Sequence, residues 1–424
     1  MNYTENVIVP ERTLLVSLDT GEYDAEESLR ELWELAKSGG AEPIATMMQK
    51  RPSPETATCV GSGMVEEIRN FCENNEIELI IFDRELTPTQ IRNLENATDV
   101  RVVDRTMLIL DIFAQRAQSR AGKVQVEAAQ LKYLLPRLTG KGTALSRLGG
   151  GIGTRGPGET KLETDRRHIR RRIEALREQL KKIEVGRHET QRRREKDGTV
   201  TVALVGYTNA GKSTLMNLLT QAGVLAEDKL FATLDPTARA LKLPGGKTVM
   251  LIDTVGLVRR LPHHLVEAFR STLEQAATAD IILNVCDASS PEARTHLDVT
   301  NEILQSLGCG DRPVIPVLNK WDLVGDADSA LHLTGAVRIS ALKNEGIPAL
   351  LQAIEDNLPV KPVDVTALLP FAKTGIAAQL RKAGALVSEE YVAEGLYIHA
   401  RVEPREMALI KPYIVENDSE NENV

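Results

Sequence analysis

One glycine-rich octapeptide constrains this chain more than any other segment: Gly206-Tyr207-Thr208-Asn209-Ala210-Gly211-Lys212-Ser213. The apolar run 202–205 precedes it, and a helix-like run starts at Thr214. A buried strand, a glycine-rich turn and a helix start, in that order, are typical of a phosphate-binding loop. Backbone N–H groups of the turn and the positive end of the helix dipole attract a polyphosphate. We therefore expect a bound nucleoside triphosphate, with Lys212 on its β and γ phosphates and Ser213 on Mg²⁺.

A second motif, Asp253-Thr254-Val255-Gly256, ends the next apolar run at 248–252. An Asp at the carboxyl end of a strand holds Mg²⁺ through water, and a Gly three residues later offers its N–H to the γ phosphate. By itself, Asp-x-x-Gly is a common turn. Behind a phosphate-binding loop at this distance, it predicts the γ-phosphate sensor of a nucleotide switch.

The base is indicated by Asn319-Lys320-Trp321-Asp322, which follows the apolar run 314–318. Guanine presents an N1–H and an N2 amine on one edge, and a carboxylate at Asp322 accepts both. A site built to hydrogen-bond such groups rejects analogues by roughly 10⁴-fold, because its buried polar atom is otherwise unpaired. GTP is therefore predicted over ATP, with Asn319 behind the base and Lys320 over its face. The element ending in Ser340-Ala341-Leu342 is expected to close over the guanine oxygen.

A loop that covers the Mg²⁺ and the γ phosphate is expected between the first helix and the strand that ends at Asp253. The segment there is Phe231-Ala232-Thr233-Leu234-Asp235-Pro236-Thr237. Its spacing leaves Thr233 and Thr237 as alternative Mg²⁺ ligands.

Hydrolysis of GTP is an in-line attack by water on the γ phosphorus, so catalysis is mainly positioning and charge neutralisation. Many GTPases orient this water with a Gln directly after Asp-x-x-Gly, where this chain has Leu257. A leucine side chain forms no hydrogen bond with water, so slow intrinsic hydrolysis is predicted, with the catalytic geometry completed by a partner. Arg259 and Arg260 are interpreted as a solvated basic pair, with charge stabilisation by one of them as the alternative.

Two small domains, one α/β and one α+β, are predicted on either side of the central motifs. Upstream, apolar runs at 12–18, 43–47, 79–82 and 101–103 alternate with helical patterns at 25–37, 64–74 and 89–95. This rhythm predicts a mainly parallel sheet. The region lacks a complete phosphate motif, so a scaffold or docking role is favoured and a second nucleotide site is the alternative. Downstream, strands at 363–369 and 395–402 and a helix at 375–382 predict a small α+β domain before an acidic tail.

Two helical patterns surround a second glycine-rich segment, residues 140–158. Apolar residues at 124, 128, 131, 135 and 138, and again between 162 and 183, predict an antiparallel helical hairpin with this segment at its tip. The second helix is rich in Arg and Lys, although the whole chain carries a net charge of −8. A solvated helix face is one interpretation, and the Gly/Arg tip favours RNA binding. The candidate RNA contacts are Arg137, Lys141, Arg147 and Arg155.

These motifs resemble the HflX family of ribosome-associated GTPases, which are related to translation factors and to Obg. Residues 148–160 are similar to the glycine-rich signature of the family, and residues 82–90 and 269–274 are similar to further family segments. The resemblance covers most of the chain. It implies Thr233 as the Mg²⁺ ligand, Ser340-Ala341-Leu342 as a base contact, and ribosomal RNA of the large ribosomal subunit as partner. It also implies a role in ribosome recycling or rescue under stress, or in ribosome biogenesis.

One departure from the family is Met64, which follows Gly61-Ser62-Gly63 where the family often has Lys. The departure weakens any second nucleotide site there. The predicted fold class is α/β, with four parts. A small α/β domain (1–118) and an antiparallel helical hairpin (119–197) precede a doubly wound P-loop GTPase domain (198–359). A small α+β domain with an acidic tail (360–424) follows.

Composition and hydropathy indicate the cellular compartment in which we expect the protein. No run reaches the roughly 18 to 20 apolar residues of a membrane span, and the N-terminus lacks a signal pattern. Peripheral membrane association has no support in the sequence. The cysteines share no metal-ligand spacing, so reduced thiols of a cytoplasmic, monomeric protein are expected. The main alternative function is a nucleotide-regulated RNA-binding or remodelling protein in which hydrolysis is secondary.

Overall fold

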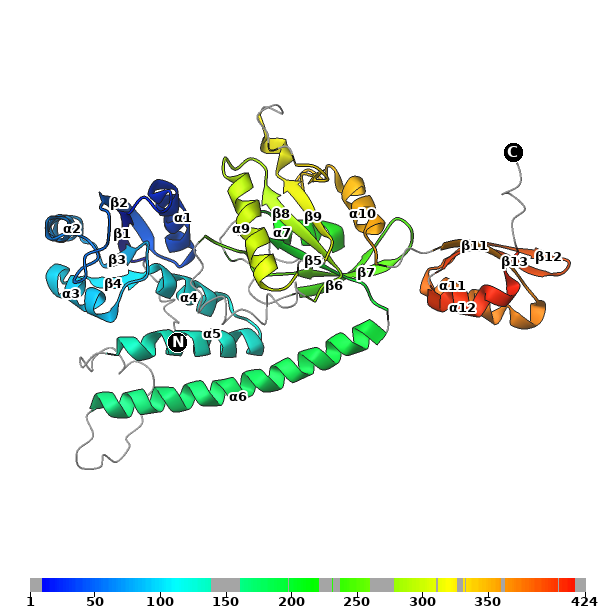
Figure 1. Ribbon diagram of the computed structural model, residues 1–424, viewed down its shortest axis with the longest axis horizontal. Coiled ribbons are helices and arrows are strands. Elements are labelled where there is room, and N and C mark those ends of the chain that lie inside the picture. The colour runs from blue at the N-terminus through cyan, green and yellow to red at the C-terminus, as the bar shows by residue number, and fades with distance from the viewer. Residues whose placement is uncertain are drawn as a thin grey trace, which may run out of the picture.

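Three separate β-sheets organise the chain in a computed structural model (Figure 1). The structure describes residues 10–138, 161–196, 198–220, 231, 237–259, 278–309, 312–325, 331, 333–359, 363–402 and 404–415. A pair of helices lies between the first and the second sheet along the chain. The predicted α/β fold class is confirmed.

The first sheet has four parallel strands in the order β2-β1-β3-β4. They are β1 (Arg12–Asp19), β2 (Glu42–Lys50), β3 (Leu79–Phe82) and β4 (Arg101–Asp104). The helices are α1 (Ala25–Ser38), α2 (Ser62–Asn75), α3 (Pro88–Thr98) and α4 (Arg105–Arg116). The mainly parallel sheet was predicted, but α4 was not, because it follows β4 without a turn signal.

Local sequence signals fix where these helices begin. The side chain of Asp24 accepts a hydrogen bond from Glu27 N (3.0 Å) and caps α1. Thr87 and Gln90 form a reciprocal capping box at the start of α3, with Pro88 in its first turn. Such caps satisfy N–H groups that have no partner inside the helix. The N-cap residues Asp24 and Thr87 therefore mark the first turns of α1 and α3.

The two linking helices form the predicted antiparallel hairpin. They are α5 (Arg120–Leu134), followed by the short η1 (Leu135–Arg137), and α6 (Lys161–Lys196). Val124 and Ala128 of α5 pack on Leu176 of α6, with Leu131 and Leu180 alongside. The predicted first helix was too long, because the α-helix ends at Leu134. The glycine-rich tip lies outside the described residues.

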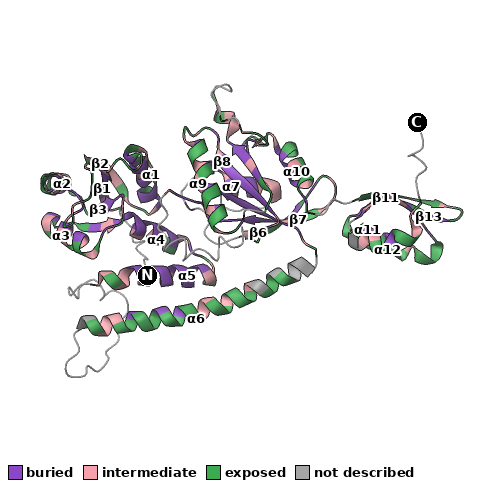
Figure 2. Ribbon diagram, viewed as in Figure 1, coloured by how far each residue is buried: buried purple, intermediate pink, exposed green. Residues whose placement is uncertain are grey.

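The two helices differ in burial, as Figure 2 shows. α5 is largely buried because it lies between α6 and the helices of the first sheet, whereas α6 is largely exposed. Among the helices that the structure describes, none is long and apolar enough to cross a membrane.

The second sheet has six strands in the order β10-β9-β8-β5-β7-β6, and β6 alone runs antiparallel to its neighbour. Its strands are β5 (Thr201–Gly206), β6 (Thr237–Lys242), β7 (Thr248–Asp253), β8 (Ile281–Asp287), β9 (Val314–Asn319) and β10 (Val337–Arg338). The helices are α7 (Lys212–Thr220), α9 (Ala293–Ser306) and α10 (Ile347–Asp356), with the one-turn η2 (Trp321–Leu323). The carboxyl ends of the parallel strands meet at one edge, which is where open α/β sheets bind ligands.

The third sheet is antiparallel, with the strand order β11-β13-β12. It consists of β11 (Val363–Leu369), β12 (Leu386–Val392) and β13 (Gly395–Val402), with α11 (Gly375–Ala383), α12 (Pro404–Ile410) and the short η3 (Phe371–Lys373) and η4 (Lys411–Tyr413). The predicted strands and helix are present. β12 was not predicted, because its polar residues Ser388, Glu389 and Glu390 hide the strand pattern.

Candidate nucleotide-binding site

The predicted phosphate-binding loop joins β5, at the centre of the second sheet, to α7. Gly211 has a φ of +88°, and a Cβ there would lie 2.2 Å from Asn319 Nδ2. Only glycine fits this position, because an L side chain would be strained and would collide with a second predicted site residue. The loop is thus shaped by close contact with the segment at the end of β9.

Lys212 is folded back onto its own loop. Its ammonium donates hydrogen bonds to Gly206 O (3.0 Å) and Tyr207 O (2.8 Å), and the residue is buried. Burial lowers the pKa of Lys212 to about 8, and the opposing effect of Asp253 does not restore it. A buried ammonium on two neutral carbonyls lacks a full counter-charge, so this lysine suits an anionic ligand.

The predicted Mg²⁺ ligand and the predicted γ-phosphate motif meet beside it. Ser213 Oγ donates a hydrogen bond to Asp253 Oδ2 (3.1 Å), although the two residues are far apart in sequence. A Cβ on Gly256 would lie 2.7 Å from Thr208 Cγ2 and 3.2 Å from Lys212 Nζ. The backbone at Gly256 therefore lies directly against the lysine.

A hydroxyl and a carboxylate are oxygen ligands of the kind that Mg²⁺ takes, usually one or two from the protein beside phosphate oxygens and water. The pair Ser213 and Asp253 fits that donor set. The buried Thr208 Oγ1 has no hydrogen-bond partner in the part of the chain that the structure describes. The site thus has two oxygen ligands suited to Mg²⁺, from Ser213 and Asp253, and beside them the Thr208 hydroxyl without a hydrogen-bond partner among the described residues.

Two backbone hydrogen bonds join this motif to the phosphate-binding loop. Thr208 N donates to Leu257 O (2.8 Å), and Leu257 N donates to Gly206 O (3.1 Å). The Leu257 side chain is buried among Ala203, Val205 and neighbouring apolar residues. The Leu257 side chain is therefore part of the apolar core of the sheet.

Asn319 connects the predicted guanine contacts to the phosphate-binding loop. Its side-chain Nδ2 donates to Ala210 O (2.8 Å), and its Oδ1 accepts from Ala341 N (3.0 Å). Both partners belong to other predicted contact segments. This one buried amide therefore ties three of the predicted motifs together inside the second sheet.

Asp322 and Lys320 lie in the turn after β9. A hydrogen bond from Ser340 and the nearby Lys343 lower the pKa of Asp322, so it is a carboxylate at neutral pH. Lys320 adopts a left-handed backbone conformation (φ +59°), and Trp321 N donates to Ile339 O (3.0 Å). The structure brings these residues together with Ser340 and Ala341. Leu342, by contrast, is largely exposed.

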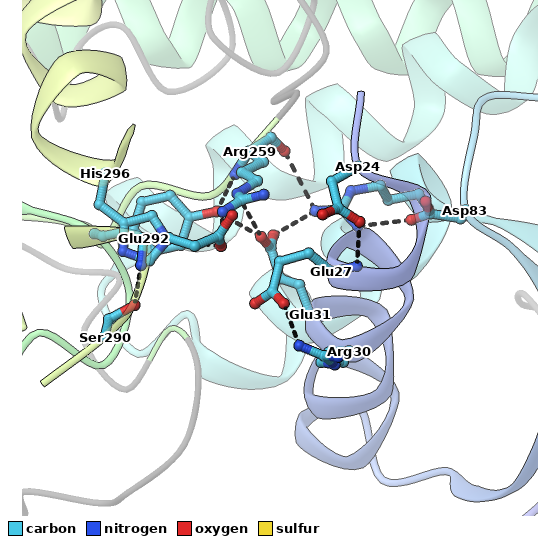
Figure 3. Close-up of polar contacts among 11 residues, drawn as sticks. Asp24, Glu27, Arg30, Glu31, Asp83, Arg259, Ser290, Glu292 and His296 are labelled. Carbon is cyan, nitrogen blue, oxygen red and sulfur yellow. Dashed lines mark hydrogen bonds and ion pairs between the residues drawn. The ribbon is translucent and has the colours of Figure 1, made fainter. Parts of the chain in front are cut away.

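The first domain makes direct contact with the phosphate-binding loop. Tyr207 OH donates to Glu31 Oε2 of α1 (2.5 Å) and accepts from Arg259 N (2.6 Å). Figure 3 shows Glu31 reaching from α1 toward Arg259, with Asp83 farther along the same network. Arg105 pairs with both Glu31 and Asp83 and donates to Arg259 O (3.3 Å). A polar network therefore joins two domains at the nucleotide site.

Arg259 overturns one expectation. Its side chain is only 15% exposed and pairs with Glu292 and with Glu31. Arg259 is thus a partly buried interdomain contact rather than part of a solvated basic pair, because Glu31 of the first domain and Glu292 of its own domain both pair with it. Arg260 lies outside the described residues.

Two further rings lie beside this network: one stacks within the GTPase domain, and the other packs on the first domain. The ring of His296 stacks on Tyr207, with ring centroids 3.9 Å apart. Burial and the neighbouring Arg259 lower the pKa of His296 to about 4. Phe231 is buried with its ring against Phe113 of α4 (4.6 Å between centroids). Phe231 begins the segment that is expected to cover the Mg²⁺ and the γ phosphate, and its side chain packs on the first domain.

Other predicted residues lie outside this cluster. Ala232, Thr233, Leu234 and Asp235 fall outside the described residues, as do Lys141, Arg147 and Arg155. Arg137 is described, and its side chain is 13% exposed, bonded to Leu86 O (3.0 Å) and Glu85, and stacked over Tyr133. The Arg137 side chain is therefore engaged in contacts within the protein and does not offer a free surface group to RNA.

Sequence reasoning missed the contacts of Glu31, Arg105, Glu292 and His296. These residues come from α1, α4 and the start of α9, and they belong to no motif. The signal that was available is Tyr207, a large polar side chain in the second position of a phosphate-binding loop. A buried tyrosine hydroxyl needs a hydrogen-bond partner, but the sequence does not say which.

Comparison with known proteins gives consistent matches along the chain. Three family models match in succession: "GTP-binding GTPase N-terminal" at residues 26–114, "GTP-binding GTPase Middle Region" at 116–194 and "50S ribosome-binding GTPase" at 201–320. "GTPase HflX" of Caldanaerobacter subterraneus subsp. tengcongensis is 50% identical over 392 residues, which are 92% of this chain and 91% of the relative.

"GTPase HflX" of Escherichia coli K12 is 41% identical over 365 residues, which are 85% of this chain and 86% of the relative. A solved structure of a GTP-binding protein from Sulfolobus solfataricus in complex with GDP is 24% identical, covers 82% of this chain and 98% of its own, and superposes with a TM-score of 0.45. The sequence matches span nearly the whole chain, so they bear on the family of the entire protein.

Proposed function

The chain belongs to the GTPase HflX family and is a GTP hydrolase, and from that premise we propose that it binds the large ribosomal subunit under the control of its nucleotide. Its role is in ribosome recycling or rescue under stress, or in ribosome biogenesis. The observation that carries the nucleotide site is the convergence of Lys212, Ser213, Asp253 and Asn319 at one edge of the second sheet. The ribosomal part is supported by the "50S ribosome-binding GTPase" model over residues 201–320.

The proposed GTP contacts come from five segments of the GTPase domain. They are the loop from Gly206 to Ser213, the segment from Ala232 to Asp235, the motif from Asp253 to Gly256, the turn from Asn319 to Asp322, and the segment from Ser340 to Leu342. Ser213 and Thr233 would hold Mg²⁺. When bound, that ion would neutralise charge on the phosphates.

The proposed contribution of this chain to hydrolysis is to position the phosphates of GTP. Lys212 exchanges its two carbonyl partners for phosphate oxygens, which gives its buried charge a counter-charge. The proposed donor to the γ phosphate is the N–H of Gly256, a residue that lies close to Lys212. Leu257 is packed in the core and orients no water. We therefore propose that intrinsic hydrolysis is slow and that the ribosome completes the catalytic geometry.

The helical hairpin is the proposed RNA-docking element. On α6, Arg170, Arg171 and Lys182 are exposed, and the helix extends beside the rest of the molecule with little covering it (Figure 2). Lys141, Arg147 and Arg155 at its tip are the proposed contacts with ribosomal RNA. Each phosphate that is neutralised adds a salt-dependent contribution to the affinity.

Co-sedimentation with purified large subunits tests this proposal. We expect binding with a non-hydrolysable GTP analogue, weaker binding with GDP, and GTPase stimulation by the subunits. The double variant Arg147→Glu, Arg155→Glu should lower the affinity and flatten its salt dependence. Arg30→Glu is the matched control, because Arg30 is an exposed arginine on α1 (70% exposed). Absence of binding together with unstimulated hydrolysis would refute the ribosomal role.

The exposed basic face of α6 also favours one alternative, a nucleotide-regulated RNA-binding or remodelling protein. In that case isolated structured RNA should bind as tightly as the large subunit does, and hydrolysis should be insensitive to the subunit. The proposed setting in either case is a monomer in the cytoplasm. Sedimentation of the free protein at several concentrations measures the oligomeric state.

A further inference from the structure

Lys320, the proposed cover of the guanine ring, is held by one carboxylate. Its Nζ lies 2.7 Å from Asp287 Oδ2, and the two side chains are 27% and 22% exposed. Asp287 ends β8, whereas Lys320 follows β9. The ion pair therefore crosses between two neighbouring strands at the edge where the nucleotide motifs meet.

Asp287 is itself fixed by its surroundings. Its Oδ1 accepts hydrogen bonds from Ser289 N (3.0 Å) and Ser289 Oγ (2.6 Å). Its backbone pairs in register with Asn319, and the following Ala288 N donates to Asn319 O (2.8 Å). One carboxylate oxygen is thus used for orientation, and the other is left to meet the ammonium of Lys320.

A lysine stem has several rotatable bonds, and fixing it costs up to about 2 kcal/mol of conformational entropy. The backbone of Lys320 is already fixed in the left-handed region, but its backbone does not determine where the stem lies. The neighbouring pair Lys343–Asp322 is longer (3.7 Å), and Lys343 is 55% exposed. Of these two lysines, Lys320 therefore has the shorter ion pair and the less exposed side chain.

We propose that Asp287 is a positioning residue for guanine binding: its ion pair with Lys320 sets the lysine stem in the place where it lies across the base. This rests on the proposed role of Lys320 in the nucleotide site. Asp287 acts only through Lys320 and touches neither the base nor the phosphates. Its loss should weaken GTP and GDP alike, because both carry the same base.

The test measures GTP and GDP dissociation constants and the GTPase kcat for D287N, K320M and the double variant. D287N keeps the shape and the acceptor for Ser289 but replaces the charged oxygen. We expect about 10-fold weaker binding of both nucleotides, with kcat at saturating GTP changed less than about twofold. D287E should restore part of the affinity. The matched control is D298N, an exposed Asp→Asn change on α9, which should leave binding unchanged.

The double variant separates positioning from a general structural effect. If Asp287 acts through Lys320, D287N should cost little more in the K320M background, so the two effects are not additive. Additive effects, or unchanged affinity in D287N while K320M binds weakly, would overturn the inference alone. Unchanged affinity in K320M would instead refute the proposed role of Lys320, and the inference with it.

Discussion

The two sides of the nucleotide pocket are built differently. On the base side, Asn319 bonds to Ala210 and Ala341, and all three residues belong to the GTPase domain. On the phosphate side, Lys212 rests on the carbonyls of its own loop, while Tyr207 and Arg259 bond to Glu31 of another domain. The base side is held together by hydrogen bonds within one domain, whereas the phosphate side also has contacts from another domain and contacts that a phosphate would exchange.

This difference assigns separate tasks to the two sides. A preformed set of hydrogen bonds gives specificity, because a wrong base leaves buried polar atoms unpaired. Contacts that must be exchanged give a response to the ligand, because each state has its own partners. The guanine itself is common to GTP and GDP. Only the phosphate side can therefore distinguish them, and the first domain touches that side.

The largest expected effect is on the base side. Asp322→Asn replaces an acceptor by a donor opposite the guanine N1–H and N2 amine, so GTP should bind weakly and xanthosine triphosphate should bind. The ratio of the two affinities should shift by about 10⁴-fold. Competition between the two nucleotides measures it. Unaltered preference for GTP would show that Asp322 does not read the base.

On the phosphate side, Lys212→Met removes charge-assisted bonds worth about 1.5 to 3 kcal/mol each, so GTP affinity should fall roughly 10²- to 10⁴-fold. The same change should not destabilise the nucleotide-free protein at pH 7. The folded pKa of Lys212, about 8, lies below its ordinary value of 10.5, so at pH 7 the fold holds a disfavoured ammonium. Thermal unfolding without nucleotide checks this. A lowered melting temperature would contradict the argument.

The contact between domains is tested by Glu31→Gln. The change keeps the shape of the side chain but removes the charge that Arg105 and Arg259 share. Since Arg105 keeps Asp83 as a partner, the loss is that of a charge-assisted hydrogen bond, and the free energy of unfolding should fall by about 2 kcal/mol. Hydrogen exchange should also become faster at residues 255–259. Glu34→Gln is the matched control, since Glu34 is an exposed residue on the same helix (58% exposed). Equal effects of both changes would mean that the network contributes nothing specific.

The smallest expected effect at neutral pH is that of His296, whose contribution appears only as a pH dependence on the acidic side. Its folded pKa of about 4 lies below the ordinary 6.5, so the unfolded state binds more protons between these values and stability falls as the pH drops from 6.5 toward 4. The slope from this one residue is at most about 1.4 kcal/mol per pH unit. His296→Gln should flatten the curve in that window, and the control His399→Gln, at a 43% exposed side chain, should not. Identical slopes in all three proteins would rule out His296 as the cause.

Much of the site followed from short-range patterns. The loop from Gly206 to Ser213 and the turn from Asn319 to Asp322 each combine a strand end with residues whose chemistry has few other uses. Because parallel strands end at the same edge, placing each motif on a strand was enough to bring them together. The hairpin could be predicted for a similar reason, since the spacing that packs Val124 on Leu176 is visible in the sequence.

The contacts that the sequence did not predict share a physical cause. Arg137, Arg259 and Phe231 were each assigned from their neighbours in sequence, yet each is covered by a segment distant in the chain. The sequence near Arg137 or Arg259 gives no sign that Glu85 or Glu31 will lie against the side chain. Such long-range contacts produce no periodic pattern in the sequence, because each helix or strand contributes only one of them.

The sequence by itself determined what the pocket binds, because the atoms that recognise a phosphate and a guanine are carried by motifs that keep their shape locally. The tertiary structure alone decided what the pocket is connected to. The partners Glu31, Arg105 and His296 of the phosphate side, and Asp287 beside Lys320, come from separate elements that meet only when the sheets and helices pack. The residues that recognise the nucleotide are adjacent in the sequence. The residues that couple the pocket to the rest of the protein are side chains that folding brings together.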